Sequence, residues 1–188
     1  DAELLTTAPV SVAAACGIDA MVHALEAYIS TAASPFSDAM AEKALELIGA
    51  NICRYTANRS DIEAAENMLV GSLFAGIAFS WARLGDVHAM SHPVSAFFNV
   101  PHGVANAILL PTIVEYNALA DHGKYFNIYN YIAPLPAALE EFTPDMLVDA
   151  IVELNDSLGI PDGLEEVGVT KDKFDAMADD AMKSGNIA

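Results

Sequence analysis

Residues 85–103 read GDVHAMSHPVSAFFNVPHG, and they hold three of the chain's five histidines, His88, His92 and His102, in an otherwise apolar setting. His88 and His92 are four positions apart, so on a helix both side chains project from one face. Aliphatic residues would pack there at lower cost, because a buried polar group must find a partner. The stretch therefore predicts a polar site within a largely apolar fold.

A second stretch, residues 17–28, reads GIDAMVHALEAY and repeats the one-turn spacing with Asp19 and His23. As a buried pair, the carboxylate and the imidazole could satisfy each other. Combined with the histidines of residues 85–103, they offer donors from three segments that can close around one cation. A donor set of oxygen and imidazole without thiolate suits Fe²⁺ or Zn²⁺ better than Ca²⁺ or Mg²⁺.

Outside these stretches the pattern is helical, and we find no internal repeat. Ser34 and Asp61 are expected N-caps, and Pro93 should kink or end any helix that runs through the histidine stretch. The uncharged run 67–82 is short for a bilayer span and is expected to be a buried helix. The predicted helices cover, approximately, residues 9–30, 35–52, 62–82, 102–119, 144–158 and 170–183. Further helical segments are expected outside these ranges, the histidine stretch among them, so the sequence predicts an all-α bundle of seven to eight helices.

The composition limits the classes of partner. With 188 residues and 54% apolar side chains, the chain can bury the core of one domain. Its formal net charge of −18 argues against nucleic acid and against anionic membranes. Cys16 and Cys53 form no CxxC pair, so we do not expect a disulfide framework. We expect a cytoplasmic location.

Residues 17–28 and 85–111 together resemble the two signature regions of the iron-containing (group III) alcohol dehydrogenase family. The rest of the chain is similar to the helical C-terminal domain of that family's two-domain, dehydroquinate synthase-like fold. Metal ligands are implied by this resemblance at Asp19, His23, His88 and His102. It also separates His88, as a ligand, from His92, as the neighbour that faces the reaction site, which spacing alone leaves open.

The resemblance implies an oxidoreductase that interconverts a primary alcohol or small diol and its aldehyde by hydride transfer with NAD or NADP. The divalent metal would polarise the substrate oxygen. His92 is the candidate catalytic residue, relaying the alcohol proton or positioning the nicotinamide; the alternative is a structural histidine bonded to a backbone carbonyl. Phe79 is the candidate substrate-binding residue, or else a plain core phenylalanine. Glu26 either orients His23 or takes part in a surface salt bridge.

A dinucleotide-binding loop is missing from the sequence, because its eleven glycines contain no GxG pair. We therefore expect residues 1–188 to be a metal-binding domain without its N-terminal nucleotide-binding domain, and to be inactive alone. The expected partners are a small alcohol or aldehyde, and other copies of the full-length protein in a homo-oligomer. Two alternatives are a non-catalytic helical domain with a structural or empty Asp/His cluster, and a zinc-dependent polyol dehydrogenase of the glycerol type.

Overall fold

The structure, a computed structural model, describes residues 1–185, so the last three residues of the predicted domain, 186–188, lie outside the described residues. Eight α-helices and three short 3₁₀ helices form the described part, which contains no strand. The prediction of an all-α fold of seven to eight helices is confirmed. The elements are η1 (Ala2–Thr7), α1 (Val10–Ile29), α2 (Pro35–Ala57), α3 (Ile62–Ala82), α4 (Asp86–Phe98), α5 (His102–Asn117), η2 (Ala118–Ala120), α6 (Lys124–Ile132), α7 (Pro144–Ser157), η3 (Lys171–Lys173) and α8 (Phe174–Ala181).

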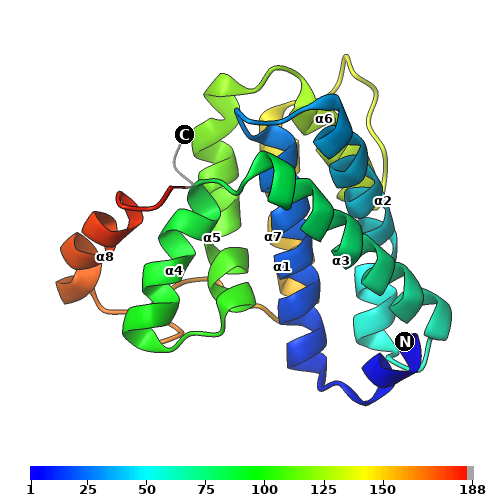
Figure 1. The fold of residues 1–188 in the computed structure, drawn as a ribbon, viewed down its shortest axis with the longest axis horizontal. Coiled ribbons are helices and arrows are strands. Elements are labelled where there is room, and N and C mark those ends of the chain that lie inside the picture. The colour runs from blue at the N-terminus through cyan, green and yellow to red at the C-terminus, as the bar shows by residue number, and fades with distance from the viewer. Residues whose placement is uncertain (186–188) are drawn as a thin grey trace.

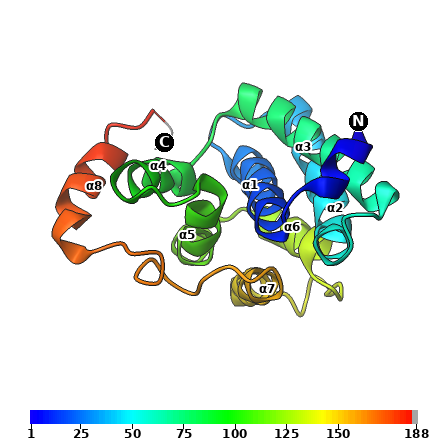
Figure 2. The ribbon, with the colours of Figure 1, turned by 90° about the horizontal axis from the view of Figure 1, so that it is seen from below.

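Helix α1 lies in the middle of the fold (Figures 1 and 2). It packs against α2 and α3 on one side and against α5 on the other, while α4 lies beside α5. Figure 2 shows α7 on the face opposite α3, where it contacts α5 and α6. Helix α8 is at the edge of the molecule, against α4. Residues on α1 can therefore meet residues of α3, α4 and α5.

The helix starts follow the local signals in the sequence. Ser34 accepts a hydrogen bond from the backbone N–H of Ser37, whose side chain in turn accepts from the Ser34 N–H, so α2 begins with a capping box. Asp61 accepts from the backbone N–H of Ala64 and caps α3. Both predicted caps are therefore present.

Gly17 is a weak point for helix propensity, and its position in the packing explains it. A Cβ atom there would lie 3.0 Å from side-chain atoms of both Ile52 and Met68. The small residue lets α1 approach α2 and α3 closely, and these contacts belong to the main hydrophobic core.

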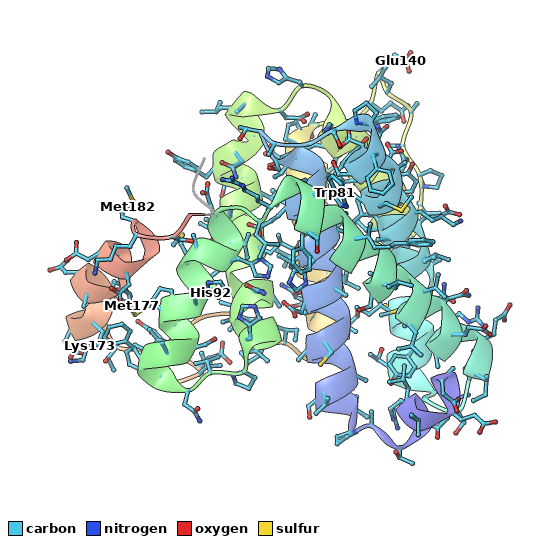
Figure 3. All side chains as sticks on the ribbon, viewed as in Figure 1. Trp81, His92, Glu140, Lys173, Met177 and Met182 are labelled. Carbon is cyan, nitrogen blue, oxygen red and sulfur yellow. The ribbon has the colours of Figure 1, made fainter. Side chains whose placement is uncertain are left out.

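The apolar run 67–82 belongs to α3, and only one face of that helix is buried. Leu73 and Trp81 are 61% and 69% exposed, respectively, and Figure 3 shows Trp81 on the near face of the molecule. Two helices, α1 and α3, are long and apolar enough to cross a membrane, with 67% and 33% of their apolar windows buried in the fold. Length and composition alone therefore do not distinguish α3 from a membrane-spanning helix. The expectation that this helix is buried was wrong for its outer face, which is exposed.

Several elements differ from the predictions, among them α2, which ends at Ala57 and not at residue 52. Helix α4 continues through Pro93 to Phe98, because a proline removes only one backbone donor and this one is buried among packed neighbours. Helix α6 was not predicted, since its nine residues are mostly aromatic and asparagine, which are weak helix formers. The last α-helix begins at Phe174, after a 3₁₀ turn.

Candidate metal centre

Helix α1 contributes the first two side chains of the predicted cluster. Asp19 and His23 are one turn apart, and Nδ1 of His23 lies 3.8 Å from Oδ2 of Asp19. Both side chains are only about one-fifth exposed, so they face the interior side of α1. The one-turn spacing therefore has the predicted geometric effect.

Helix α4 contributes His88, whose side chain is 1% exposed. Its Nε2 atom lies 3.7 Å from Oδ1 of Asp19, and its ring centroid is 4.4 Å from that of His23. One donor atom from each of Asp19, His23 and His88 falls within 4.8 Å of the others. Two helices thus bring three possible metal ligands together.

Helix α5 contributes His102 at its first position. Nε2 of His102 lies 3.6 Å from Oδ1 of Asp19, and its ring centroid is 5.2 Å from that of His88. The next residue, Gly103, explains the close approach, since a Cβ atom there would lie 2.0 Å from the carbonyl oxygen of Ala15. The structure therefore brings all four predicted ligand residues together.

Asn106 is a polar neighbour of this cluster that the sequence analysis missed. Its amide nitrogen lies 2.6 Å from Oδ1 of Asp19, 3.2 Å from Nε2 of His88 and 3.1 Å from Nε2 of His102. The residue is fully buried, and its carbonyl oxygen has no hydrogen-bond partner among the described residues. Its position four residues after His102, on the same face of α5, is the signal that could have found it.

The surroundings of the Asn106 amide nitrogen indicate whether a metal ion fits in this cluster. Three acceptor atoms converge on one neutral NH₂ group, and a divalent cation satisfies the same convergence of a carboxylate oxygen and imidazole nitrogens. The donor set and the orphaned amide oxygen of Asn106 both fit a cation bound here.

Glu26 also lies beside the cluster, but in a position that the sequence analysis did not predict. It is 2% exposed, and its carboxylate contacts His88 of α4, not His23. Oε2 lies 2.5 Å from Nδ1 of His88, and Oε1 accepts a hydrogen bond of 2.6 Å from the backbone N–H of Val87. Glu26 follows Asp19 by two helical turns, and this spacing is the signal for a shared face.

The electrostatics favour a charged carboxylate and mostly neutral imidazoles. Burial opposes ionisation of Asp19, but the nearby imidazoles of His88, His23 and His102 and the hydrogen bond from Asn106 outweigh it and lower its pKa. Burial lowers the pKa of His23 and of His102. Burial also disfavours charge on His88, yet the two nearby carboxylates of Asp19 and Glu26 prevail and raise its pKa to about 9. A metal at Nε2 of His88 therefore competes with a proton.

The predicted catalytic and substrate-binding residues lie next to the cluster. The ring of His92 stacks on that of His102, with a centroid distance of 5.2 Å, and Figure 3 shows it on α4. Partial burial of its ring, together with the nearby imidazoles of His102 and His88, lowers the pKa of His92, although the residue is exposed on one side. Phe79, on α3, stacks on His23 at 4.7 Å. The fifth histidine, His122, is exposed in the turn before α6 and is not part of the group.

Comparison with known proteins places these features in a family. Residues 13–188 match the family described as "Fe-containing alcohol dehydrogenase family, C-terminal". The chain is 41% identical over 187 residues to 1,3-propanediol dehydrogenase of Citrobacter freundii, covering 99% of this chain and 48% of that protein. It is 40% identical over 191 residues to lactaldehyde reductase of Escherichia coli strain K12, covering 99% and 50%.

A solved structure of a similar protein has the same fold. The crystal structure of a 1,3-propanediol oxidoreductase superposes with a TM-score of 0.94 at 39% identity, over 100% of this chain and 49% of that one. The chain therefore spans about half the length of the curated relatives that it matches.

Proposed function

Since the chain belongs to the iron-containing alcohol dehydrogenase family, we propose that it is the metal-binding part of an oxidoreductase. The proposed reaction interconverts a primary alcohol or small diol and its aldehyde with NAD or NADP. The similarity to relatives named for propanediol and lactaldehyde supports a small substrate. The observation that carries the proposal is the convergence of Asp19, His23, His88 and His102 from three helices.

In this proposal those four residues hold the cation, with Fe²⁺ as the native metal and Zn²⁺ as the alternative that the same donors accept. When bound, the cation supplies a Lewis acid that polarises the substrate oxygen. The ionised Asp19 offsets part of the cation's charge, and the burial that keeps His23 and His102 neutral leaves their lone pairs free for coordination.

Two further side chains act on the substrate in this proposal. Phe79 covers His23 with its ring and offers an apolar wall for the carbon chain of the alcohol. His92, stacked on His102 and with a pKa lowered by burial, accepts the alcohol proton or positions the nicotinamide. A bound nicotinamide would supply the hydride acceptor or donor.

We place the nucleotide-binding residues outside this chain. The glycines form no GxG pair, and the described residues include no strand on which a dinucleotide-binding loop could be built. The chain alone should therefore bind metal without oxidising alcohol. The full-length protein would be a cytoplasmic homo-oligomer that acts on small molecules, and the net charge of −18 on these 188 residues disfavours contact of this part with nucleic acid or anionic membranes.

Metal analysis tests the proposal directly. After anaerobic loading with Fe²⁺, and separately with Zn²⁺, the parent chain should retain about one metal ion per chain. His88→Ala and His102→Ala should lose it, whereas His122→Ala, which removes an exposed histidine outside the cluster, should retain it. Equal and substoichiometric metal in all four proteins would contradict the site and favour a structural Asp/His cluster.

A further inference from the structure

We propose that Glu26 is a positioning residue that fixes the orientation and the tautomer of His88, so that Nε2 of this imidazole is the nitrogen offered to the metal. The inference rests on the proposed function, because it assigns Glu26 a role toward the same site. It differs from the sequence expectation, in which Glu26 oriented His23 or lay at the surface.

The first support is the pairing of two buried groups. Glu26 and His88 are 2% and 1% exposed, and Oε2 of Glu26 lies 2.5 Å from Nδ1 of His88. An ionised carboxylate has only acceptors, so the ring nitrogen that faces it must carry a proton. In the neutral form, which is the one that can bind a metal, this imidazole has its lone pair on Nε2, which lies 3.7 Å from Oδ1 of Asp19 and 3.2 Å from the amide nitrogen of Asn106.

The second support is the way that Glu26 holds the start of α4. Gly85 precedes this helix and has no side chain with which to cap it. Instead, Oε1 of Glu26 accepts from the backbone N–H of Val87, one of the donors that a helix start leaves without an intrahelical partner. Glu26, a residue of α1, thus caps the start of α4. Its carboxylate is hydrogen-bonded both to the backbone of the residue before His88 and to the His88 ring.

The third support is the space left at Gly85. A Cβ atom at this position would lie 2.9 Å from Oε1 and 3.3 Å from Cδ of Glu26. The backbone φ of −131° is open to other residues, so a larger residue here would press mainly on the Glu26 carboxylate. The segment that leads into α4 is therefore shaped around the carboxylate of Glu26.

Glu26→Gln separates positioning from packing, because the two side chains have nearly the same size. The carboxylate accepts from two donors, the Val87 N–H and the His88 Nδ1–H, but an amide has one acceptor oxygen. If that oxygen faces Val87, the amide NH₂ faces Nδ1 of His88 and favours the tautomer with the proton on Nε2. That tautomer blocks the nitrogen that the metal needs.

The experiment measures Zn²⁺ affinity by competition with a chromophoric chelator. Glu26→Gln should bind Zn²⁺ about 10–100-fold more weakly than the parent, the range seen when a residue that orients a metal-binding histidine is changed. Glu42→Gln is the matched control, since Glu42 also accepts a 2.5 Å hydrogen bond, from the Tyr28 hydroxyl, away from the site. This control should keep the parent affinity. Circular dichroism verifies that both variants are folded.

A second readout does not depend on metal. The proton NMR spectrum of the metal-free parent should contain a strongly downfield ring N–H signal from His88, assigned by its loss in His88→Ala. It should persist in Glu42→Gln and disappear in Glu26→Gln. Persistence of that signal in Glu26→Gln, or a Zn²⁺ affinity equal to the parent's, would overturn the inference. A parent that binds no metal, while Glu26→Gln abolishes the signal, would overturn the proposed function and still support the hydrogen-bonded orientation of His88.

Gly85→Ala tests the same contact by steric means. It should weaken Zn²⁺ binding in the parent by pushing on the Glu26 carboxylate, and it should have little further effect in a Glu26→Ala background. A loss of affinity that is the same in both backgrounds would show that Gly85 acts without Glu26, and would count against the inference.

Discussion

Replacing Gly103 with alanine tests how the approach of α5 to α1 sets the metal centre. A Cβ atom at this position would lie 2.0 Å from the carbonyl oxygen of Ala15 and 3.2 Å from Cβ of Asp19. Ordinary contacts begin at 3.4 Å, so the approach to Ala15 falls short by about 1.4 Å. Because the obstacle is backbone, the first turn of α5 must move, and His102 must move with it.

Two opposing effects determine the expected stability. Alanine in place of a helical glycine stabilises by about 0.5–1 kcal/mol, whereas forcing extra atoms into packed structure costs about 1–3 kcal/mol. We expect the second effect to prevail, with a fall in Tm at about 2–4 °C per kcal/mol for a chain of this size. A displacement near 1 Å also separates His102 from Asp19, so metal affinity should fall about tenfold or more.

Thermal unfolding followed by circular dichroism, together with a Zn²⁺ competition titration, measures both effects. The matched control is Gly76→Ala on α3, where a Cβ atom would meet nothing within 4 Å. That variant should gain about 1–4 °C in Tm and bind metal as the parent does. If Gly103→Ala instead behaves like Gly76→Ala in both assays, the close approach at Gly103 does not position His102.

Three further predictions concern the rest of the fold. Hydrogen bonds from the Ala64 N–H and Arg54 lower the pKa of Asp61 below its ordinary 3.8, so the ionised side chain stabilises the fold above that pH and loses this effect as the pH falls through the lowered pKa. Asp61→Ala should therefore lower Tm at pH 7 and lower it progressively less toward pH 3. An equal loss of Tm at both pH values would contradict the role of the ionised carboxylate. Ile48→Ala empties a fully buried position and should cost about 2–5 kcal/mol in urea unfolding, so that a loss below about 1 kcal/mol would show an adaptable core. Light scattering should detect self-association through the exposed face of α3 that Leu73→Glu reduces and Leu139→Glu, at an equally exposed leucine elsewhere, does not, while a monomeric parent would refute the prediction.

Local signals predicted most of the fold. Ser34 and Asp61 mark helix starts because their side chains satisfy backbone donors within three residues, a geometry that depends on nearby sequence alone. Buried positions one turn apart on α2, such as Leu45 and Ile48, follow from the helical period. Helix α6 was missed because it depends on burial of Tyr125 and Ile128 against other elements, and not on its own propensity.

The candidate site was predictable in part. Spacing placed Asp19 with His23 on one face and left His88 and His92 equivalent, and only the resemblance to a family distinguished them. In the structure His88 is buried against Asp19, while His92 is exposed and stacks on His102. The contact between Glu26 and His88 was not predictable, because a helical pattern gives the face of a residue but not which neighbouring helix covers it.

The convergence on Asp19 joins positions that are far apart along the chain, since His102 follows it by 83 residues. A metal ion bound to both Asp19 and His102 would link α1 to α5 reversibly, and it can bind in this way only after the two helices have packed together. The unfolded chain does not hold these residues together and has no such site. Every tenfold rise in the free metal-ion concentration above its Kd should therefore add about 1.4 kcal/mol to the free energy of unfolding. The melting temperature of this helical domain should therefore report the metal supply around it.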